Sequence, residues 1–340
     1  MTRSASLYRY RLPMDTGVIL RGRRLTERIG YIAELREGAR IGRGEIAPLP
    51  GFSVECADQA GQQSLHALKR WVAGQDIMAC ARWPSVAFGL SMAALELQGE
   101  LPITARYQTV PLLSHESVNA GAEGAAANLS VPADCRLAKL KLGRGSPQQD
   151  AVNVSALLKA HPSLMLRLDA NCAWSLPQAR EFARHLAPDH ASRIAFIEEP
   201  CQRPADSLTF SKETGLALAW DETLQAAVRQ PGFTLDTDFR LDSLSGANTL
   251  VIKPTLIGSV QRCIALIRQA QQTGTKAVIS ASLESSLGLT QLARLSCWLL
   301  PGSVPGLDTL SLFRSQLELT WPGSTLPVKP LQQQTRVWHS

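Results

Sequence analysis

Three apolar runs of the chain each finish in a carboxylate, and this repeat constrains the fold more than any other feature. The runs are Leu164–Asp169, Ile194–Glu198 and Leu216–Asp221. Short runs of large aliphatic residues are typical of strands buried in a parallel sheet. The C-terminal ends of such strands are where α/β proteins place their functional side chains. We therefore expect three acidic side chains at one edge of a parallel sheet.

From Val110 to Thr309, short apolar runs alternate with helix-like stretches. This alternation favours a doubly wound sheet or a (β/α)8 barrel. We predict the barrel, because polar residues end many of the runs and a closed ring directs them to one point. The Gly-rich nucleotide-binding fingerprint is absent from the sequence. The candidate strands are Val110–Leu113, Leu137–Leu142, Leu164–Asp169, Ile194–Glu198, Leu216–Asp221, Leu250–Lys253, Ala277–Ser282 and Pro305–Thr309.

The first hundred residues have a different pattern, with strands that precede helices. Alternation predicts paired strands at Ser4–Leu12 and Ile29–Leu35, joined by a loop that includes Pro13–Arg21. A Gly/Pro-rich connection follows over Gly42–Ser53, and Ser53 is expected to N-cap a helix that runs to Trp71. A second helix is predicted from Ser85 to Gln98. Together these elements indicate a separate α+β unit.

The predicted fold class is therefore α/β, a modified TIM (β/α) barrel with an N-terminal α+β capping domain. We expect the capping domain at residues 1–105, the barrel at 106–317 and a C-terminal tail at 318–340 that packs back on the capping domain. The tail becomes polar at Gln332–Gln334, so its end is expected to fray.

Composition limits the classes of function. The chain has 340 residues, 45% of them hydrophobic and 19% charged, with a net charge of +6, which describes a soluble globular protein. The basic residues are scattered and no apolar run approaches a membrane span, so we expect neither nucleic-acid nor membrane partners. Seven cysteines without a CxxC pair, and an N-terminus unlike a signal peptide, indicate a cytoplasmic protein. We expect a small-molecule carboxylate as partner, and a monomer or weak oligomer.

Asp169, Glu198 and Asp221 are the candidate metal ligands. Carboxylate oxygens suit Mg²⁺, with Mn²⁺ as a substitute, better than Zn²⁺, because no histidine or cysteine ends these strands. The alternative is that each acid caps the helix that follows it or pairs with a neighbouring cation. Three acids on successive strands favour the metal site.

Three lysines stand out beside these acids. Lys139 and Lys141 share one face of their strand, and Lys253 ends a later strand. An inward lysine near a cation needs a function or a partner. Lys141 is the candidate base, and Lys253 is placed to act on the opposite face of a substrate. The alternative, strongest for Lys139, is a salt bridge to the acid cluster.

Further polar residues are candidates for substrate binding. Ser280 and Ser282 share a face of their predicted strand and could donate to a carboxylate, although bonding to the backbone is as common. Backbone N–H groups up to Gly288, at a predicted helix start, form a natural anion site. With Lys139 and Arg167, these residues complete the expected substrate-binding set. Cys172 has no histidine at a motif spacing, so we expect no nucleophilic role.

The order of these lysines and acids resembles the muconate-lactonizing subgroup of the enolase superfamily. More specifically, motifs over nearly the whole chain are similar to those of the proteobacterial o-succinylbenzoate synthases. The family has the motif Asp-Ala-Asn-Arg-Ala-Trp, and in this chain Cys172 occupies the position of its arginine. The motifs are Pro13–Gly17, Gly44–Ser53, Pro84–Gly89, Ile194–Cys201, Val251–Thr255, Ser285–Arg294, Pro305–Thr309 and Trp321–Ser324.

This resemblance implies a hydro-lyase of menaquinone biosynthesis. It implies metal-dependent syn dehydration of 2-succinyl-6-hydroxy-2,4-cyclohexadiene-1-carboxylate (SHCHC) to 2-succinylbenzoate, with lysine proton abstraction and a Mg²⁺-stabilised enediolate. Two lysines on opposite faces suit other reactions of the superfamily as well. An N-acylamino acid racemase, a dipeptide epimerase and a muconate cycloisomerase are therefore the alternatives.

Overall fold

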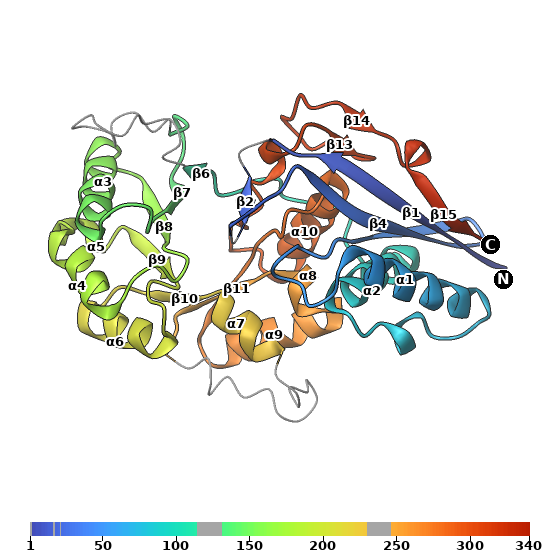
Figure 1. Ribbon diagram of the computed structural model, residues 1–340, viewed down its shortest axis with the longest axis horizontal. Coiled ribbons are helices and arrows are strands. Elements are labelled where there is room, and N and C mark those ends of the chain that lie inside the picture. The colour runs from blue at the N-terminus through green and yellow to red at the C-terminus, as the bar shows by residue number, and fades with distance from the viewer. Residues whose placement is uncertain (1, 16–17, 21, 114–130, 230–245) are drawn as a thin grey trace. The chain divides into compact units, whose positions relative to one another are not determined.

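The structure of the chain is a computed structural model that describes residues 2–15, 18–20, 22–113, 131–229 and 246–340 (Figure 1). The predicted loop positions 16, 17 and 21 lie outside the described residues. The chain divides into two compact units. Unit 1 comprises Met1–Thr109, Ile252–Arg268 and Val278–Ser340, and unit 2 comprises Val110–Val251 and Gln269–Ala277.

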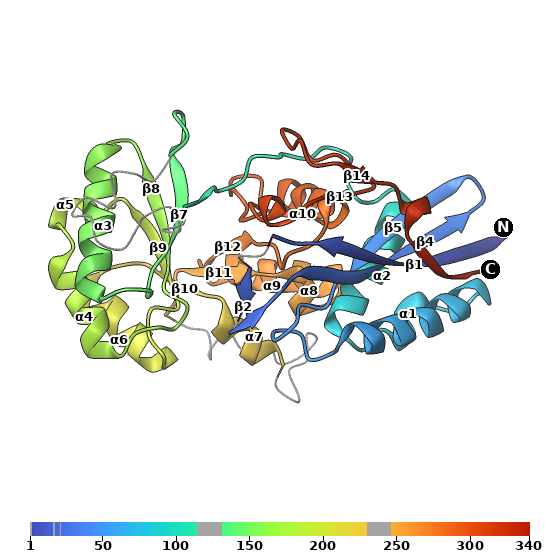
Figure 2. The ribbon, with the colours of Figure 1, turned by 45° about the horizontal axis from the view of Figure 1, so that its top comes forward.

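Unit 1 contains a four-stranded sheet in the order β15-β1-β4-β5. β1 (Arg3–Pro13) and β4 (Glu27–Glu37) pair antiparallel along their whole length, which confirms the two predicted strands. β15 (Thr335–His339) pairs with the other edge of β1, and the two termini lie together (Figure 2). The expected fraying of the tail is therefore wrong, because the edge of β1 offers backbone hydrogen bonds that hold the last residues.

Two helices cover one face of this sheet. α1 (Ala57–Val72) and α2 (Pro84–Gln98) bury their apolar faces against β1 and β4. The prediction that Ser53 caps α1 is wrong, since Cys56 is the N-cap residue and forms a capping box with Gln59. The Ser53 hydroxyl instead accepts a hydrogen bond from the N–H of Leu49, which closes a turn before the helix.

The predicted Gly/Pro-rich connection at Gly42–Ser53 is also partly wrong, because its first residues form the strand β5 (Arg40–Ile46). The two glycines of β5, Gly42 and Gly44, allow this strand to pack closely against α2. A Cβ atom on Gly44 would lie 1.8 Å from the carbonyl oxygen of Gly89 in α2. Only glycine allows the strand and the helix to approach this closely.

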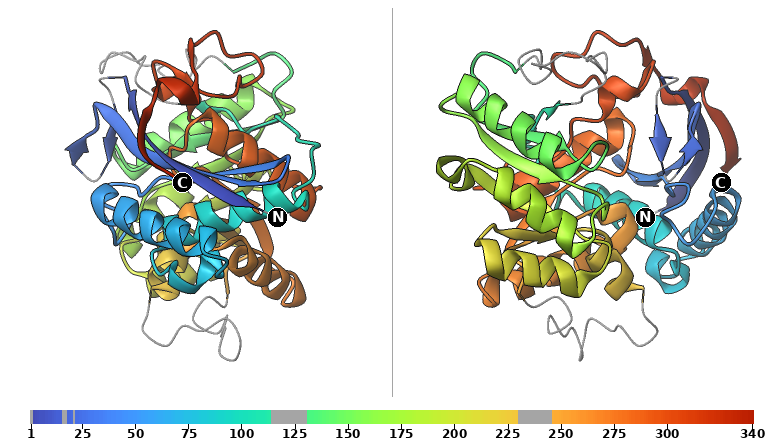
Figure 3. Two further views of the ribbon diagram at one scale, coloured as in Figure 1. Left: turned by 90° about the vertical axis from the view of Figure 1, so that its right-hand side faces the viewer. Right: turned by 60° about the vertical axis from the view of Figure 1, so that its left-hand side comes forward.

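The larger sheet has seven strands in the order β12-β11-β10-β9-β8-β7-β6, and the pairs from β6 to β11 are parallel. Most of it belongs to unit 2, and its strands alternate with helices of both units along this part of the chain, as predicted (Figure 3). In chain order the elements are β6 (Leu112–Leu113), β7 (Leu137–Lys141), α3 (Pro147–Ala160), β8 (Met165–Asp169), α4 (Leu176–His185), α5 (Pro188–Ala191), β9 (Ile194–Glu198), α6 (Pro204–Thr214), β10 (Leu218–Trp220), α7 (Glu222–Val228), β11 (Thr249–Ile252), α8 (Pro254–Ile257), α9 (Val260–Gln272) and β12 (Lys276–Ile279).

Alternation along the strands of unit 2 separates its core from its polar face. Leu140 on β7, with Leu166 and Leu168 on β8, packs into one hydrophobic cluster with Phe182 of α4 and Phe210 of α6. The intervening residues of β7 and β8 face the other side of the sheet. That side therefore carries the lysines, the arginine and the acids singled out in the sequence.

The predicted eighth strand, Pro305–Thr309, is only an isolated parallel bridge between Ser280 and Gly306. It nevertheless bonds on two sides, because Ala281 N–H donates to Gly306 and the Thr109 hydroxyl contacts the backbone of Pro305 and Leu307. The remaining elements are β2 (Ile19–Leu20), β3 (Arg23–Arg24), η1 (Ile77–Cys80), α10 (Ser286–Leu299), η5 (Leu310–Leu312), β13 (Gln316–Leu317), β14 (Val328–Lys329) and η6 (Leu331–Gln333).

Within the described ranges, every helix is too short or too polar to cross a membrane.

Candidate active site

The strand register of unit 2 brings the predicted base and two predicted metal ligands into one row. Lys141 pairs with Asp169, and Asp169 pairs with Glu198. Asp221 follows β10, whose Ala219 pairs with Glu198. The three acids are buried, with exposed fractions of 3%, 3% and 2%. The carboxylates expected from the repeated strand ends therefore lie along one edge of the sheet.

Lys139 supplies a cation between two of these acids. Its Nζ lies 2.7 Å from Asp169 Oδ2 and 2.6 Å from Glu198 Oε2. Burial lowers the pKa of Lys139, but the two carboxylates outweigh it and hold that pKa above its usual range. The salt-bridge alternative considered for Lys139 is thus the arrangement that the structure adopts.

The two acids respond differently to burial. Burial raises the pKa of Asp169, but Lys139 and Lys141 outweigh this effect and hold the pKa below its usual range. Burial raises the pKa of Glu198. Repulsion by Asp169 and Asp221 raises this pKa further, whereas the ammonium of Lys139 lowers it. Glu198 therefore lies close enough to both other acids for like charges to interact, and a further cation among them would relieve that repulsion.

Lys141 is held by two partners. Its Nζ lies 3.0 Å from Asp169 Oδ2 and donates to Asn171 Oδ1 at 2.6 Å. Asn171 has a φ of 47° and its N–H donates to Asp169 Oδ1 at 3.1 Å. Asn171 was not predicted from the sequence as a site residue, although an asparagine is one of the few residues that adopt this left-handed backbone easily.

Asp221 is oriented by two further residues that were not predicted from the sequence. Gln225 Nε2 donates to Asp221 Oδ1 at 2.7 Å, and the Asp221 N–H donates to Glu199 Oε1 at 2.9 Å. Gln225 lies one helical turn after Asp221, so i,i+4 spacing was a usable signal. Glu199 carried no such signal beyond its place next to Glu198.

The described residues contain no group of three or more His, Cys, Asp or Glu side chains that could hold a metal ion as they stand. The ammonium of Lys139 lies between two of the three acids instead. The alternative that Asp221 caps the helix that follows it is not what the structure shows. Asp221 is the N-cap residue of α7, but its side chain makes no capping hydrogen bond within the described part of the chain.

Arg167 shares the polar face with these groups. Its guanidinium lies 5.2 Å from the ring centre of Phe196, and its buried Nε has no hydrogen-bond partner among the described residues. Burial lowers the pKa of Arg167 to about 10, against the attraction of Glu198. An unpaired buried donor of this kind is suited to an anionic ligand.

The other predicted residues belong to unit 1. Lys253 is half-buried at the N-terminus of α8. Ser280 donates to Gly306 O at 3.2 Å, whereas the buried Ser282 hydroxyl has no hydrogen-bond partner within the described ranges. How these three residues meet the acids of unit 2 stays a prediction.

The anion site expected near Gly288 has an occupant from the chain itself. The N–H groups of Ser285 and Gly288 donate to the carboxylate of Glu45 on β5, at 2.9 and 2.8 Å. A Cβ atom on Gly288 would lie 2.2 Å from Glu45 Oε2. The start of α10 thus binds a carboxylate, but this carboxylate is the side chain of Glu45 and not a ligand. A substrate contact by Gly288 stays a prediction.

Cys172 has no activating environment. Its thiol is half-buried beside several acids, and burial together with Glu199 raises the pKa of Cys172 to about 12. A thiol of this kind is a poor nucleophile.

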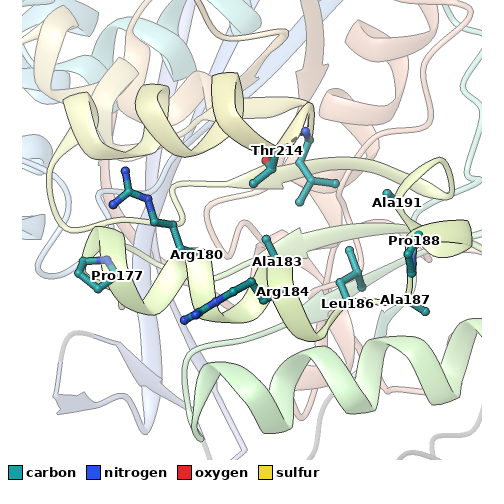
Figure 4. A pocket seen from close by; sticks show the side chains of 10 residues that line it. Pro177, Arg180, Ala183, Arg184, Leu186, Ala187, Pro188, Ala191 and Thr214 are labelled. Atoms are coloured by element: carbon teal, nitrogen blue, oxygen red, sulfur yellow. Dashed lines mark hydrogen bonds between the residues drawn. The ribbon is translucent and has the colours of Figure 1, made fainter.

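A surface groove of about 720 Å³ lies elsewhere on unit 2 (Figure 4). Its lining comes from α4, α5 and the end of α6, and includes Arg180, Arg184 and Thr214. The three carboxylates do not line it.

Comparison with known proteins identifies the family of the chain. Two family models match the chain, "MenC, N-terminal domain" over residues 2–97 and "Enolase C-terminal domain-like" over residues 122–313. The o-succinylbenzoate synthase of Vibrio cholerae serotype O1 (strain M66-2) is 54% identical over 338 residues, covering 99% of this chain and 98% of that protein. The o-succinylbenzoate synthase of Aliivibrio fischeri (strain MJ11) is 45% identical, covering 99% and 100%.

Solved structures agree on the fold. The o-succinylbenzoate synthase of Thermosynechococcus elongatus BP-1, complexed with Mg in its active site, superposes with a TM-score of 0.70 at 24% identity, covering 92% of this chain and 94% of that one. A dipeptide epimerase of Cytophaga hutchinsonii gives 0.68 at 20% identity, covering 93% and 88%. At these identities the likeness concerns the fold alone. Together with the matching enolase domain and the curled parallel sheet, it confirms the predicted fold class.

Proposed function

The chain belongs to the o-succinylbenzoate synthase family of the enolase superfamily, and we propose that it dehydrates SHCHC to 2-succinylbenzoate at the strand ends of unit 2. The observation that carries the proposal is the row formed by Lys141, Asp169 and Glu198. A basic side chain beside a buried acid cluster is what removal of a proton α to a carboxylate requires. The full-length similarity to curated o-succinylbenzoate synthases supports this substrate.

Asp169, Glu198 and Asp221 would hold a divalent metal ion, Mg²⁺ with Mn²⁺ as a substitute. Their donor set fits, because all three are buried carboxylates and the space between two of them already attracts the ammonium of Lys139. When bound, the ion supplies a positive charge that stabilises the negative charge developing on the substrate carboxylate.

Lys141 would act as base and then as acid. Its neutral amine takes the proton from the carbon that bears the carboxylate, and the resulting ammonium returns that proton to the departing hydroxyl. The C–O bond breaks, water leaves and the ring becomes aromatic. One lysine acting twice implies syn elimination. The contacts of Lys141 with Asp169 and Asn171 support this role, because they restrict the amine to one position at the strand end.

The remaining candidates would bind and orient the substrate. Lys253 would stabilise the developing enediolate from the opposite face, and Arg167 would offer its unpaired Nε to a substrate oxygen. The other proposed substrate-binding residues are Lys139, Ser280, Ser282 and Gly288.

We further infer a capping domain at residues 1–105, a catalytic barrel at 106–317 and a tail at 318–340. The proposed partner is a small-molecule carboxylate, without nucleic acid or membrane, for a cytoplasmic monomer or weak oligomer.

The test is an absorbance assay of SHCHC consumption with Mg²⁺, with and without EDTA. Lys141→Ala should abolish turnover, whereas Lys159→Ala, which removes an exposed lysine of α3, should not change it. Asp221→Asn should weaken Mn²⁺ binding measured directly by electron paramagnetic resonance. Near-wild-type turnover by Lys141→Ala would show that the base is misassigned.

The same samples distinguish the alternative reactions of the superfamily. A racemase or epimerase would exchange the α-hydrogen of N-acyl amino acids with deuterium from the solvent. Such exchange, without SHCHC turnover by the metal-loaded protein, would overturn the proposed dehydration.

A further inference from the structure

The backbone that follows β12 is held by buried charged side chains of unit 1 that no part of the proposed reaction uses. These are Arg28 on β4, Glu45 on β5 and Glu284, with exposed fractions of 1%, 2% and 1%. Buried charges are retained only when they are paired or hydrogen-bonded. Their contacts therefore indicate what each one holds in place.

Arg28 ties two backbone segments together. Its guanidinium donates to the carbonyl oxygens of Ser282 and Leu283 at 3.1 and 3.0 Å. It also donates to those of Ala47 and Pro48, at 2.9 and 2.7 Å. The rigid fork of an arginine fixes all four carbonyl groups at once, which a lysine could not do.

Glu284 connects the ends of two neighbouring strands. Its Oε1 accepts from the hydroxyl of Thr255 on α8 at 2.6 Å, and its Oε2 accepts from the N–H of Ser282 at 2.5 Å. Thr255 is fully buried and follows Lys253 within the first turn of α8. One carboxylate therefore sets Ser282 relative to the helix that begins at Lys253.

The Ser282 side chain differs from its backbone in its hydrogen bonding. Its hydroxyl oxygen is buried and has no hydrogen-bond partner in the described part of the chain, although the Ser282 N–H and C=O are both bonded. Leu283 follows with a φ of 59°, which a leucine adopts only when its surroundings impose it. The backbone is thus fully determined around a buried hydroxyl that makes no hydrogen bond within the described residues.

We propose that Glu284 is a positioning residue for substrate binding: it holds the Ser282 hydroxyl in the orientation that donates to a substrate oxygen. The proposal rests on the proposed function, because Ser282 is one of its substrate contacts. Glu284 itself does not touch the substrate, and Thr255 is the anchor through which it acts. Arg28 and Glu45 hold the same segment from the two sides of Glu284.

Glu284→Gln is the primary test. An amide keeps the shape of the carboxylate but has no charge and only one acceptor oxygen, so the contact with Thr255 or with Ser282 loses a charge-assisted hydrogen bond. We expect KM for SHCHC to rise about tenfold, as for the loss of one buried hydrogen bond, with a smaller change in kcat. Thr255→Val, which removes the anchoring hydroxyl, should raise KM in the same direction.

Glu55 provides a matched control in the same unit. This buried carboxylate accepts from the N–H and hydroxyl of Ser85 at the start of α2, much as Glu45 does from Ser285 at the start of α10. Glu55→Ala should lower Tm at least as much as Glu284→Gln, because it removes both contacts with Ser85, but it should leave KM unchanged. Equal KM values for the two variants would show that Glu284 has only a structural role.

A double-mutant cycle with Ser282→Ala separates positioning from general damage. If Glu284 acts through Ser282, adding Glu284→Gln to Ser282→Ala should raise KM less than about threefold further, because the contact is already gone. Fully multiplicative effects would overturn the proposal. Wild-type protein that does not consume SHCHC would instead contradict the proposed function, so the two failures are distinguishable.

Discussion

Lys139→Met is the substitution that most directly tests how the acid cluster is stabilised. The ammonium contacts Asp169 and Glu198 at 2.7 and 2.6 Å, and both acids are buried. Methionine keeps the length of the side chain but removes its charge. The two carboxylates then face each other without the cation that separates them. The contacts of Lys141 with Asp169 and Asn171 do not involve Lys139, so the substitution removes a single charge from the cluster.

The expected loss of stability follows from these contacts. Removing one partner of a buried ion pair destabilises a protein by about 3–5 kcal/mol, because the remaining charge is left uncompensated. With a shift of about 2–4 °C per kcal/mol, Tm should fall on the order of 10 °C in the absence of divalent metal. Lys159→Met, a change of the same type at an exposed lysine, should change stability by less than about 0.5 kcal/mol.

The loss should also depend on pH. Burial raises the pKa of Glu198 to about 7, so between about 4.3 and that value the folded chain binds a proton that the unfolded chain releases. Unfolding therefore releases protons, and stability falls as pH rises through this window. Lys139 opposes that shift, so its removal should extend the decline in stability to higher pH.

Urea denaturation with EDTA at pH 5 and pH 8 measures both effects. The deficit of Lys139→Met relative to wild type should be larger at pH 8, where the two carboxylates must ionise together. A deficit that matches that of Lys159→Met, or one that is equal at the two pH values, would refute the reasoning.

Three further predictions concern other parts of the chain. Gly44→Ala should destabilise unit 1 by about 1–3 kcal/mol or prevent folding, measured by urea denaturation, because its Cβ would meet the backbone oxygen of Gly89 at 1.8 Å. Deletion of residues 335–340 should lower Tm and promote aggregation visible by light scattering, because it removes β15 and exposes the edge of β1. Iodoacetamide at pH 8 should modify the exposed Cys56 well before Cys172, as mass spectrometry of peptides would show, because the pKa of the Cys172 thiol is raised to about 12.

Local sequence patterns determined much of the fold. Runs of aliphatic residues that end in an acid identified β8, β9 and β10, and the helix predicted at Ser85–Gln98 matches α2 to within one residue. These patterns suffice because burial on one face of a strand or helix depends on the spacing of nearby residues. They failed at β5, where two glycines looked like a loop but serve close contact with α2.

The sequence by itself determined that Asp169, Glu198 and Asp221 end successive strands beside a pair of lysines. Only the tertiary structure decided that the ammonium of Lys139 lies between Asp169 and Glu198, since this depends on the register of three strands. The same holds for Glu45, which fills the start of α10 from a strand far away in the chain. Partners separated by hundreds of residues leave no periodic trace in one sequence, because packing of the complete chain brings them together.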